Sequence, residues 1–275
     1  MKWGIRYDHW VPGDYGGDDR TDIAVWRPRN GTWYIRGVGT VVWGREGDRP
    51  VPADYNGDGK TDIAVVRGPQ DGCSVPMVWY IRGVGTFTWG RGCDGTVPAD
   101  YNGDGRAEAA VTRYCHCADP SAPLTWYIRG VRTVEWGVGG GDRADRAMPA
   151  NYVGDKRTDL GVIRTTTSEW KWYIRGAATP VVWGGKATPD GFLDDMPTPA
   201  NYIGDSHDDI AVFRQSTGEW FIRGLSAPIT WGKGGGRSDW PVPGDYGGDS
   251  HTDIAVVRYS PTDETLTWFI RVGTQ

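Results

Sequence analysis

The sequence lacks the features that would place it in several functional classes. No apolar run approaches the roughly 20 residues that a membrane-spanning helix needs, so we expect no membrane insertion. The formal net charge is -5, with 30 basic against 35 acidic residues, which gives no electrostatic reason to bind nucleic acid. The opening stretch MKWGIRYDHW also has no apolar core of the signal-peptide kind. The ligand is therefore expected to be neither a nucleic acid nor a membrane.

Catalytic patterns are equally scarce. No serine stands in a GxSxG motif, and most paired carboxylates recur in loops whose spacing suits a cation. The four histidines show no recurring partner; they are His9, His116, His207 and His251. We therefore expect a protein that is not an enzyme, with an active site concealed at the centre of the fold as the alternative.

Repeats dominate what the sequence does contain. The stretch VPADYNGDGKTDIAVVR at 51–67 returns as VPADYNGDGRAEAAVTR at 97–113. Its first oxygen-bearing side chain recurs six times at intervals of 40 to 51 residues, as Asp14, Asp54, Asp100, Asn151, Asn201 and Asp245. We expect one domain over 1–275 built from six units, at approximately 11–50, 51–96, 97–147, 148–197, 198–241 and 242–275 plus 1–10.

Each unit contains four short segments that favour strands, in the order VPxDY, DIAVxR, WYIRG or WFIRG, and TVVWG. A period of this length with four strands per unit predicts the blades of a β-propeller. The sixth unit ends at TWFIRVGTQ without a fourth strand, while the opening KWGIR has no unit before it. We therefore expect an all-β, six-bladed propeller with four antiparallel strands per blade, whose N-terminal strand closes the last blade.

The oxygen-rich loops of the second and third units have the spacing of a calcium-binding loop. Oxygen ligands stand at positions 1, 3, 5 and 9, a glycine follows position 5, and position 7 offers its backbone carbonyl. In loop two the ligand residues are Asp54, Asn56, Asp58, Lys60 and Asp62. In loop three they are Asp100, Asn102, Asp104, Arg106 and Glu108. The sequence predicts structural Ca²⁺ in both loops.

The other four loops depart from this pattern by degrees. Loops one and six keep three carboxylates but have glycine at position 3, so a water molecule would supply one ligand. Their carboxylates are Asp14, Asp18, Asp22, Asp245, Asp249 and Asp253. Loops four and five have asparagine at position 1 and Val153 or Ile203 at position 3, which predicts turns without metal. The alternative for all six loops is that aspartate and asparagine only cap turns by accepting backbone N–H groups.

The motif DYNGDGKTDIAVVR resembles the FG-GAP or VCBS-type repeat, the blade of integrin-α-like propellers, which also occurs in bacterial and fungal lectins. The resemblance covers essentially the whole chain and is most specific in loops two and three. It implies calcium between the first and second strands of a blade, serving stability rather than catalysis. The sequence departs from the family in having no complete FG-GAP tripeptide and in lacking the ligand set in loops four and five.

The units differ mainly on one face of the predicted ring. Alternating strand direction places the cation loops and the RGVGT-type turns on one face, and the second-to-third-strand loops and inter-blade connections on the other. Long, unlike segments such as GPQDGCSVPMV and GKATPDGFLDDMPTP fall on the second face. Because recognition usually lies in loops carried by a rigid scaffold, we expect the second face to bind the ligand.

Tryptophan indicates what that face could bind. Twelve of the 16 tryptophans occupy repeated positions, six in the third strand and six in the outer strand. We expect the third-strand set to pack between blades; it comprises Trp33, Trp79, Trp126, Trp172, Trp220 and Trp268. The outer-strand set is expected nearer solvent, where a ring can stack on a sugar; it comprises Trp3, Trp43, Trp89, Trp136, Trp183 and Trp231.

Three tryptophans, Trp10, Trp170 and Trp240, break the repeat and fall on the variable face. An aromatic platform beside carboxylates and a guanidinium suits a neutral polyhydroxylated ligand, so we predict sugar contacts here, with loop packing as the alternative. The charged residues near them in sequence are Asp8, Asp239 and Arg237.

Twelve arginines also recur, at the ends of the second and third strands. We expect them to pair with the loop carboxylates or to stack on tryptophan, with donation to sugar hydroxyls as the alternative for the second-strand set. The second-strand set is Arg27, Arg67, Arg113, Arg164, Arg214 and Arg258, and the third-strand set is Arg36, Arg82, Arg129, Arg175, Arg223 and Arg271.

Two functions fit these patterns. The first is a lectin with repeated shallow sites that binds glycans or glycoproteins and gains avidity from multivalency. The second is a protein-binding adhesion or scaffold module of the integrin type. We expect the lectin, with the adhesion or scaffold module as the alternative.

The four cysteines favour an oxidising, extracellular setting. We expect Cys73 to pair with Cys93, because both lie on the variable face of the second unit. Cys115 and Cys117 then pair with each other or exchange partners with the first pair, since four cysteines allow three connectivities. A zinc site of the four thiolates, with His116, is the alternative, although the spacing matches no standard pair of CxxC hooks.

Overall fold

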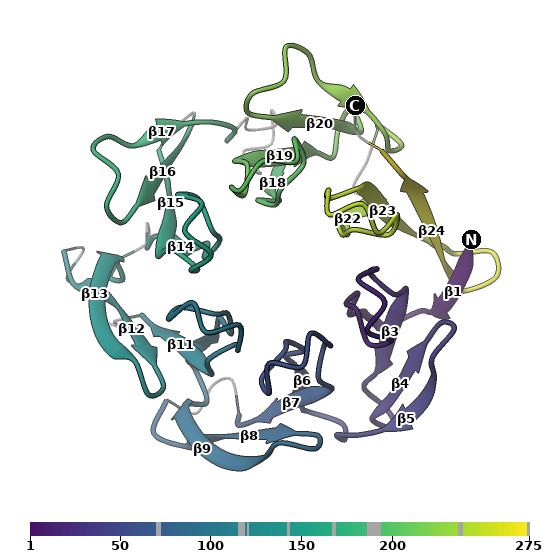
Figure 1. The fold of residues 1–275 in the computed structure, drawn as a ribbon, viewed down its shortest axis with the longest axis horizontal. Helices are drawn as coiled ribbons and strands as arrows, with labels where there is room; N and C mark the ends of the chain where they lie inside the picture. Colours follow the sequence, from purple (N-terminus) through teal and green to yellow (C-terminus); the bar gives the residue numbers. More distant parts are fainter. Residues whose placement is uncertain are drawn as a thin grey trace.

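The computed structural model describes residues 1–69, 73–114, 119, 121–141, 144–166, 169–185, 194–235 and 239–273. Within these ranges the chain forms strands and loops, and it contains no helix long and apolar enough to span a membrane. Figure 1 shows the strands grouped into six blades around a common centre. The prediction of an all-β, six-bladed propeller is confirmed.

Each blade is a four-stranded antiparallel sheet whose first strand lies nearest the centre. Blade one is β2 (His9–Trp10), β3 (Ala24–Arg27), β4 (Thr32–Ile35) and β5 (Gly39–Val42). Blade two is β6 (Arg49–Pro50), β7 (Ala64–Arg67), β8 (Pro76–Ile81) and β9 (Gly85–Arg91). Blade three is β10 (Gly95–Thr96), β11 (Ala110–Arg113), β12 (Pro123–Ile128) and β13 (Arg132–Val138).

The remaining three blades have the same order. Blade four is β14 (Arg146–Ala147), β15 (Gly161–Thr165), β16 (Trp170–Ile174) and β17 (Val181–Val182). Blade five is β18 (Asp195–Pro197), β19 (Ala211–Arg214), β20 (Glu219–Ile222) and β21 (Ile229–Thr230). Blade six is β22 (Asp239–Pro241), β23 (Ile254–Ser260), β24 (Thr265–Arg271) and, as its outer strand, β1 (Lys2–Ile5).

The ring is closed by the two ends of the chain, as predicted. Strand β1 pairs antiparallel with β24, with Lys2 opposite Thr267 and Ile5 opposite Thr265. The terminal ammonium of Met1 donates to the carbonyl of Trp268, and the Trp268 N–H donates to the carbonyl of Met1, both at 2.7 Å. The first and last segments of the sequence therefore share one sheet.

The inner strands begin two or three residues before the expected VPxDY segments. In blade one the regular strand is His9–Trp10, and the ladder resumes only at an isolated bridge between Gly13 and Asp22. Pro12, between these two parts, has no N–H to give to the ladder. The same interruption recurs in every blade, which leaves the oxygen-rich loop as a separate turn at the inner edge.

The core lies between neighbouring blades, and its largest members are the third-strand tryptophans. All six are at most 1% exposed, which confirms the packing prediction for this set. Each also donates its indole N–H to the carbonyl of the outer-strand tryptophan of the same blade, at 2.9 Å. The third and fourth strands of a blade are thus held together by side chains as well as by the ladder.

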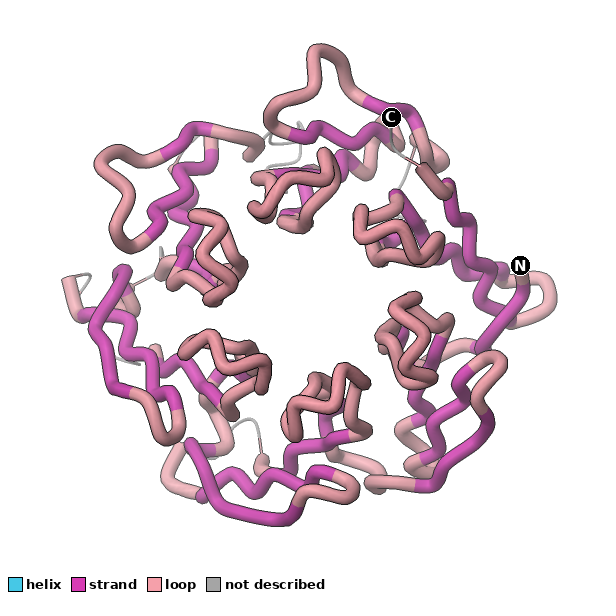
Figure 2. The backbone as a smooth tube through the Cα atoms, viewed as in Figure 1, coloured by secondary structure: helices cyan, strands magenta, loops and turns pink. Residues whose placement is uncertain are grey.

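The two faces of the ring carry different elements. We call the face with the six oxygen-rich loops the loop face; Figure 2 shows these loops around the centre of the ring. The turns between third and fourth strands lie on it too, since a methyl group at Gly16 would be only 3.6 Å from Val38 Cγ2. We call the opposite side, with the second-to-third-strand loops and the inter-blade connections, the insertion face.

Candidate functional site: cation loops, inter-blade contacts and two pockets

Loops two and three are shaped by their own carboxylates. In loop two, Asp54 accepts hydrogen bonds from the N–H groups of Gly57 (2.6 Å) and Gly59 (2.8 Å). Asp62, at position 9, accepts from the Tyr55 N–H at 2.9 Å. The turn-capping role, which was the alternative for these loops, is therefore present.

Loop three has the geometry that suits a cation best. One oxygen from each of Asp100, Asp104 and Glu108 lies within 4.8 Å of the others, and no other group of three or more acidic, histidine or cysteine ligands meets this spacing in the described parts of the chain. Burial raises the pKa of Glu108, and the charges of Asp100 and Asp104 raise it further. A cation would offset this repulsion, so the donor set fits a hard oxygen-seeking ion.

The same electrostatic condition holds in the other loops that keep three carboxylates. Burial raises the pKa of Asp62, and the neighbouring Asp58 and Asp54 add to the increase. Burial also raises the pKa values of Asp22 and Asp253, with a further increase from Asp14 and Asp18 for the first and from Asp249 for the second. In loops one and six the N–H of the position-3 glycine donates to the position-9 aspartate, which uses part of that carboxylate.

Loops four and five keep the turn without the full ligand set. Asn151 and Asn201 accept from the N–H groups of Gly154 and Gly204, each at 2.8 Å, so an amide oxygen replaces the capping carboxylate. At position 3, Val153 and Ile203 are 48% and 37% exposed and offer no side-chain oxygen. These two loops expose apolar surface where loops two and three carry an asparagine.

The six loops are joined into a belt that the sequence analysis did not predict. In every blade the N–H at position 8 donates to the position-1 carbonyl of the preceding loop, at 2.6 to 2.7 Å. The donor and acceptor pairs are Thr61 and Asp14, Ala107 and Asp54, Thr158 and Asp100, Asp208 and Asn151, Thr252 and Asn201, and Thr21 and Asp245. Backbone groups carry no sequence signal, which is why the belt could not be foreseen.

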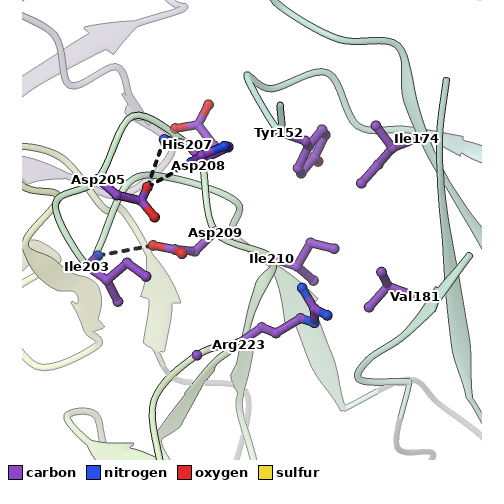
Figure 3. Close-up of a pocket in the computed structure, with 11 residues that line it drawn as sticks. Tyr152, Ile174, Val181, Ile203, Asp205, His207, Asp208, Asp209, Ile210 and Arg223 are labelled. Atoms are coloured by element: carbon purple, nitrogen blue, oxygen red, sulfur yellow. Dashed lines mark hydrogen bonds and ion pairs between the residues drawn. The ribbon is translucent and has the colours of Figure 1, made fainter. Parts of the chain in front are cut away.

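A pocket of about 500 Å³ opens on the loop face between blades four and five (Figure 3). Its apolar wall includes Ile174 and Ile203, while the Asp205 carboxylate lies 3.3 Å from the ring nitrogen of His207. Figure 3 shows the Arg223 side chain extending toward Ile210. Each carboxylate here has a partner: Asp208 accepts the Asn151 N–H, and Asp209 accepts the N–H groups of Tyr202 and Ile203.

The insertion face carries six bidentate ion pairs, and they correct the prediction for the second-strand arginines. These arginines pair with aspartates at, or immediately before, the first residue of the inner strands, not with the cation-loop carboxylates, at Nε to Oδ1 distances of 2.6 to 2.9 Å. They also lie over tyrosine or phenylalanine rings, not tryptophan, at 4.2 to 4.6 Å. The aspartates are Asp8, Asp48, Asp94, Asp145, Asp195 and Asp239.

Each of these aspartates joins two blades. Its second oxygen also accepts a backbone N–H from the end of the preceding blade, at 2.6 to 3.0 Å. The carboxylates are at most 1% exposed and fully engaged. Asp8 and Asp239 are therefore structural, and the expected sugar contact of Asp239 is wrong. The sequence did contain the signal, since an aspartate stands six residues before position 1 in every unit.

The outer-strand tryptophans also connect blades. Trp43 donates its indole N–H to the Tyr80 carbonyl of the next blade at 3.0 Å, and Trp3, Trp89, Trp183 and Trp231 make the equivalent bond at 3.0 to 3.2 Å. All six rings, Trp136 included, are half-buried rather than exposed. This set therefore lies nearer solvent than the buried third-strand set, at the blade junctions, as expected, and its stacking on sugar stays a prediction.

The three irregular tryptophans differ from one another. Trp170 is only 3% exposed and packs in the core between blades four and five, so the expected sugar contact is wrong for this residue. Trp10 and Trp240, on the inner strands of blades one and six, lie with ring centroids 5.6 Å apart. Trp240 is 39% exposed, so this pair keeps an accessible aromatic surface.

A second pocket lies on the insertion face where blades six, one and two meet. It has a volume of about 680 Å³ and is lined by Tyr7, which is 75% exposed. Tyr7 has a φ of 70°, in a turn where blade two has Gly47 with a φ of 86°. Both turns are closed by the same bond, from the Asp8 N–H to the Ile5 carbonyl in one and from the Asp48 N–H to the Arg45 carbonyl in the other, at 3.1 Å.

The disulfide between Cys73 and Cys93 is present, with a Cα to Cα distance of 4.9 Å. It joins the second-to-third-strand loop of blade two to the connection that leaves that blade, as predicted. Cys115 and Cys117, as well as His116 and Arg237, lie outside the described residues, so their predicted roles stay predictions.

These features define a six-bladed β-propeller whose blades are tied together by backbone, indole and carboxylate contacts. Comparison with protein families matches residues 54–111 to the FG-GAP-like repeat. No curated protein matches the chain. The matched segment contains loops two and three, and together with the six-bladed fold it supports an FG-GAP repeat propeller, as the resemblance implied. A fold of this kind supports a binding module of the protein-binding or adhesion type.

Proposed function

We propose that this protein is a secreted carbohydrate-binding propeller whose principal sugar site is the pocket beside Tyr7 on the insertion face. The observation that carries the proposal is the conformation and exposure of Tyr7. A tyrosine with positive φ costs about 1–3 kcal/mol relative to relaxed backbone, and such strain tends to cluster at functional sites. Blade two has Gly47 at the equivalent position, and glycine adopts positive φ without strain. Blade one keeps a tyrosine there despite the strain, which supports a function for the phenol ring of Tyr7.

The chemistry of the pocket suits a neutral ligand rich in hydroxyl groups. The Arg6 guanidinium lies over the Tyr7 ring, with its carbon 4.6 Å from the ring centroid, so hydrogen-bond donors stand at one face of the ring. Apart from the structural Asp8–Arg27 pair, the lining carries both signs of charge; its arginines are Arg6 and Arg29, and its carboxylates are Glu46, Asp263 and Glu264. Aromatic stacking with donors and acceptors at the edge is how proteins hold a sugar ring.

Calcium in loops two and three is part of this proposal as a stabilising ion. The residues that would hold it are those of the predicted ligand sets, and the crowding of Asp100, Asp104 and Glu108 supports the assignment in loop three. The ion would neutralise carboxylates whose pKa values are raised by burial and by one another. It would take no part in the contact with sugar, because the loops lie on the opposite face of the ring.

The test is a glycan array followed by inhibition with single monosaccharides, using Tyr7→Gly and Trp240→Ala. We expect Tyr7→Gly to weaken glycan binding at least tenfold while unfolding at the same or a higher temperature, because glycine relieves the backbone strain. Trp240→Ala removes the other exposed aromatic ring of the described chain and should leave binding unchanged. Unchanged binding in Tyr7→Gly, or loss in Trp240→Ala alone, would contradict the proposed site.

A protein-binding adhesion module is the second candidate, favoured by the match to the FG-GAP-like repeat. Enzymatic removal of glycans from a bound glycoprotein separates the two. Loss of binding after deglycosylation supports the sugar site, whereas binding that survives it supports contact with the polypeptide.

A further inference from the structure

In blades one to five, the fourth strand carries one residue directly opposite the third-strand tryptophan, and the size of this residue varies. In chain order these residues are Val41, Phe87, Val134, Val181 and Ile229. They are half-buried and pack against the core between neighbouring blades. Blade two therefore has an aromatic ring where the other four blades have valine or isoleucine.

The ring in blade two is held by an arginine of the next blade. Phe87 lies parallel to Trp79, with an angle of 11° between the planes and 6.3 Å between the ring centroids. On blade three, Arg129 follows the third strand, and its guanidinium carbon lies 4.0 Å from the Phe87 centroid. A guanidinium at this distance attracts the face of an aromatic ring. The junction of blades two and three is therefore filled by a ring with an arginine over it.

The junction of blades four and five has the arginine but not the ring. Arg223 corresponds to Arg129, since each follows the third strand of its blade, and both are exposed. Within the described chain the Arg223 guanidinium has no hydrogen bond, ion pair or ring contact. Val181 takes the place of Phe87, and Arg223 and Val181 both line the pocket of about 500 Å³. Figure 3 shows Arg223 extending from blade five toward Val181 of blade four. The pocket thus opens between the counterparts of the stacked pair in blades two and three.

The rest of the lining determines which ligand suits this space. Ile174 and Ile203 add apolar surface beside Val181. Loop five contributes three carboxylates, against one arginine and one histidine in the lining; they are Asp205, Asp208 and Asp209. Burial raises the pKa of Asp208, and the charge of Asp209 raises it further. A positive group on the ligand is therefore favoured beside loop five, and a negative group is opposed.

We propose that the pocket between blades four and five binds a small ligand that combines an aromatic ring with an ammonium group. The ring lies against Val181 under the Arg223 guanidinium, in the contact that Arg129 makes with Phe87 within the chain. The ammonium group lies beside the carboxylates of loop five. The inference is independent of the proposed sugar site, because this pocket is on the loop face and the Tyr7 pocket is on the insertion face.

The experiment measures binding to the folded full-length chain at neutral pH and constant ionic strength, with three probes that separate the two parts of the ligand. The probes are phenylethylamine, cyclohexylethylamine and phenylacetate. We expect phenylethylamine to bind. Cyclohexylethylamine keeps the ammonium group but lacks the aromatic face, so it should bind several-fold more weakly. Phenylacetate keeps the ring but places a carboxylate near loop five, so it should bind at least tenfold more weakly.

Two variants test the two residues that correspond to the stacked pair. Val181→Phe places the chain's own ring in the pocket, so it should abolish binding of phenylethylamine while the protein melts at or above the wild-type temperature. Arg223→Lys keeps the charge but loses the planar guanidinium, so it should weaken binding several-fold. Since Arg223 is exposed, this second variant tests the site without altering the core.

The matched control is Val41→Phe, which adds the same ring at the equivalent position of blade one and should leave binding unchanged. Several results would overturn the site. They are equal affinity for the three probes, no binding of phenylethylamine by the wild type, binding that survives in Val181→Phe, unchanged binding in Arg223→Lys, and equal loss in Val41→Phe and Val181→Phe.

Discussion

In the described chain, one blade junction lacks the indole hydrogen bond that the other five have, and this difference allows a quantitative test of how neighbouring blades are held together. Five outer-strand tryptophans donate to a carbonyl of the next blade, but the Trp136 indole N–H is buried and has no partner in the described chain. Trp89, one blade earlier, makes the bond to the Tyr127 carbonyl at 3.2 Å. We predict that Trp89→Phe destabilises the protein clearly more than Trp136→Phe.

The magnitude follows from what each substitution removes. Both lose a similar amount of half-buried ring, so that cost largely cancels. Trp89→Phe also loses a hydrogen bond with a net contribution of about 1 kcal/mol. Trp136→Phe instead removes a buried donor without a partner, which relieves about 1–3 kcal/mol. The two free energies of unfolding should therefore differ by about 2–4 kcal/mol.

Urea denaturation of the two variants and the wild type provides the assay, with equal m-values as the sign that the same surface unfolds. For a chain of this size the expected difference corresponds to roughly 5–15 °C in melting temperature. Equal destabilisation by the two substitutions would refute the idea that these indole groups join neighbouring blades. Greater destabilisation by Trp136→Phe would refute it more strongly.

Three further outcomes are expected. Chelation of calcium should lower the melting temperature, since a site filled at 100 times its Kd contributes about 2.7 kcal/mol; an unchanged curve with no calcium in elemental analysis would contradict this. In calcium, Asp58→Ala in loop two should destabilise more than Asp205→Ala in loop five, because of these two loops only loop two keeps a complete ligand set, and equal melting curves would make both loops plain turns. Cys73→Ser should cost about 3 kcal/mol in urea denaturation, as expected for a closed loop of about 20 residues; a midpoint equal to that of the wild type would show that the Cys73–Cys93 bond contributes nothing.

The fold could be predicted because its signals repeat. Six copies of one oxygen-rich motif fixed the number of blades, and the unpaired segments at Lys2–Ile5 and Thr265–Arg271 indicated how the ring closes. Periodic valine and tryptophan positions are local information, and within a blade every strand except β1 pairs with its neighbour in sequence. The prediction failed only at strand starts, where Pro12 and its equivalents interrupt the ladder.

The candidate site was harder to predict, because it depends on which charges meet in space. Asp239 and Trp170 looked available for a ligand, but Arg258 engages the first and the core encloses the second. Conversely, Tyr7 carried no signal in the sequence, since its importance lies in a positive φ and in the pocket beside it. An alignment of the six units around the connecting aspartates would have revealed the structural role of Asp239.

The pairing of β1 with β24 has a consequence for how the protein is made. On the ribosome, Lys2–Ile5 emerges before the other strands of the propeller, yet its partner Thr265–Arg271 is synthesised only after all the other blades. Until then the first strand has an open edge, and blade six lacks its outermost strand. Because the sequence separation between the two strands is almost the whole chain, joining them is expected to be a late and slow step of folding. A mutation that weakens the pairing of β1 with β24 should therefore cause newly made chains to aggregate before it measurably lowers the melting temperature.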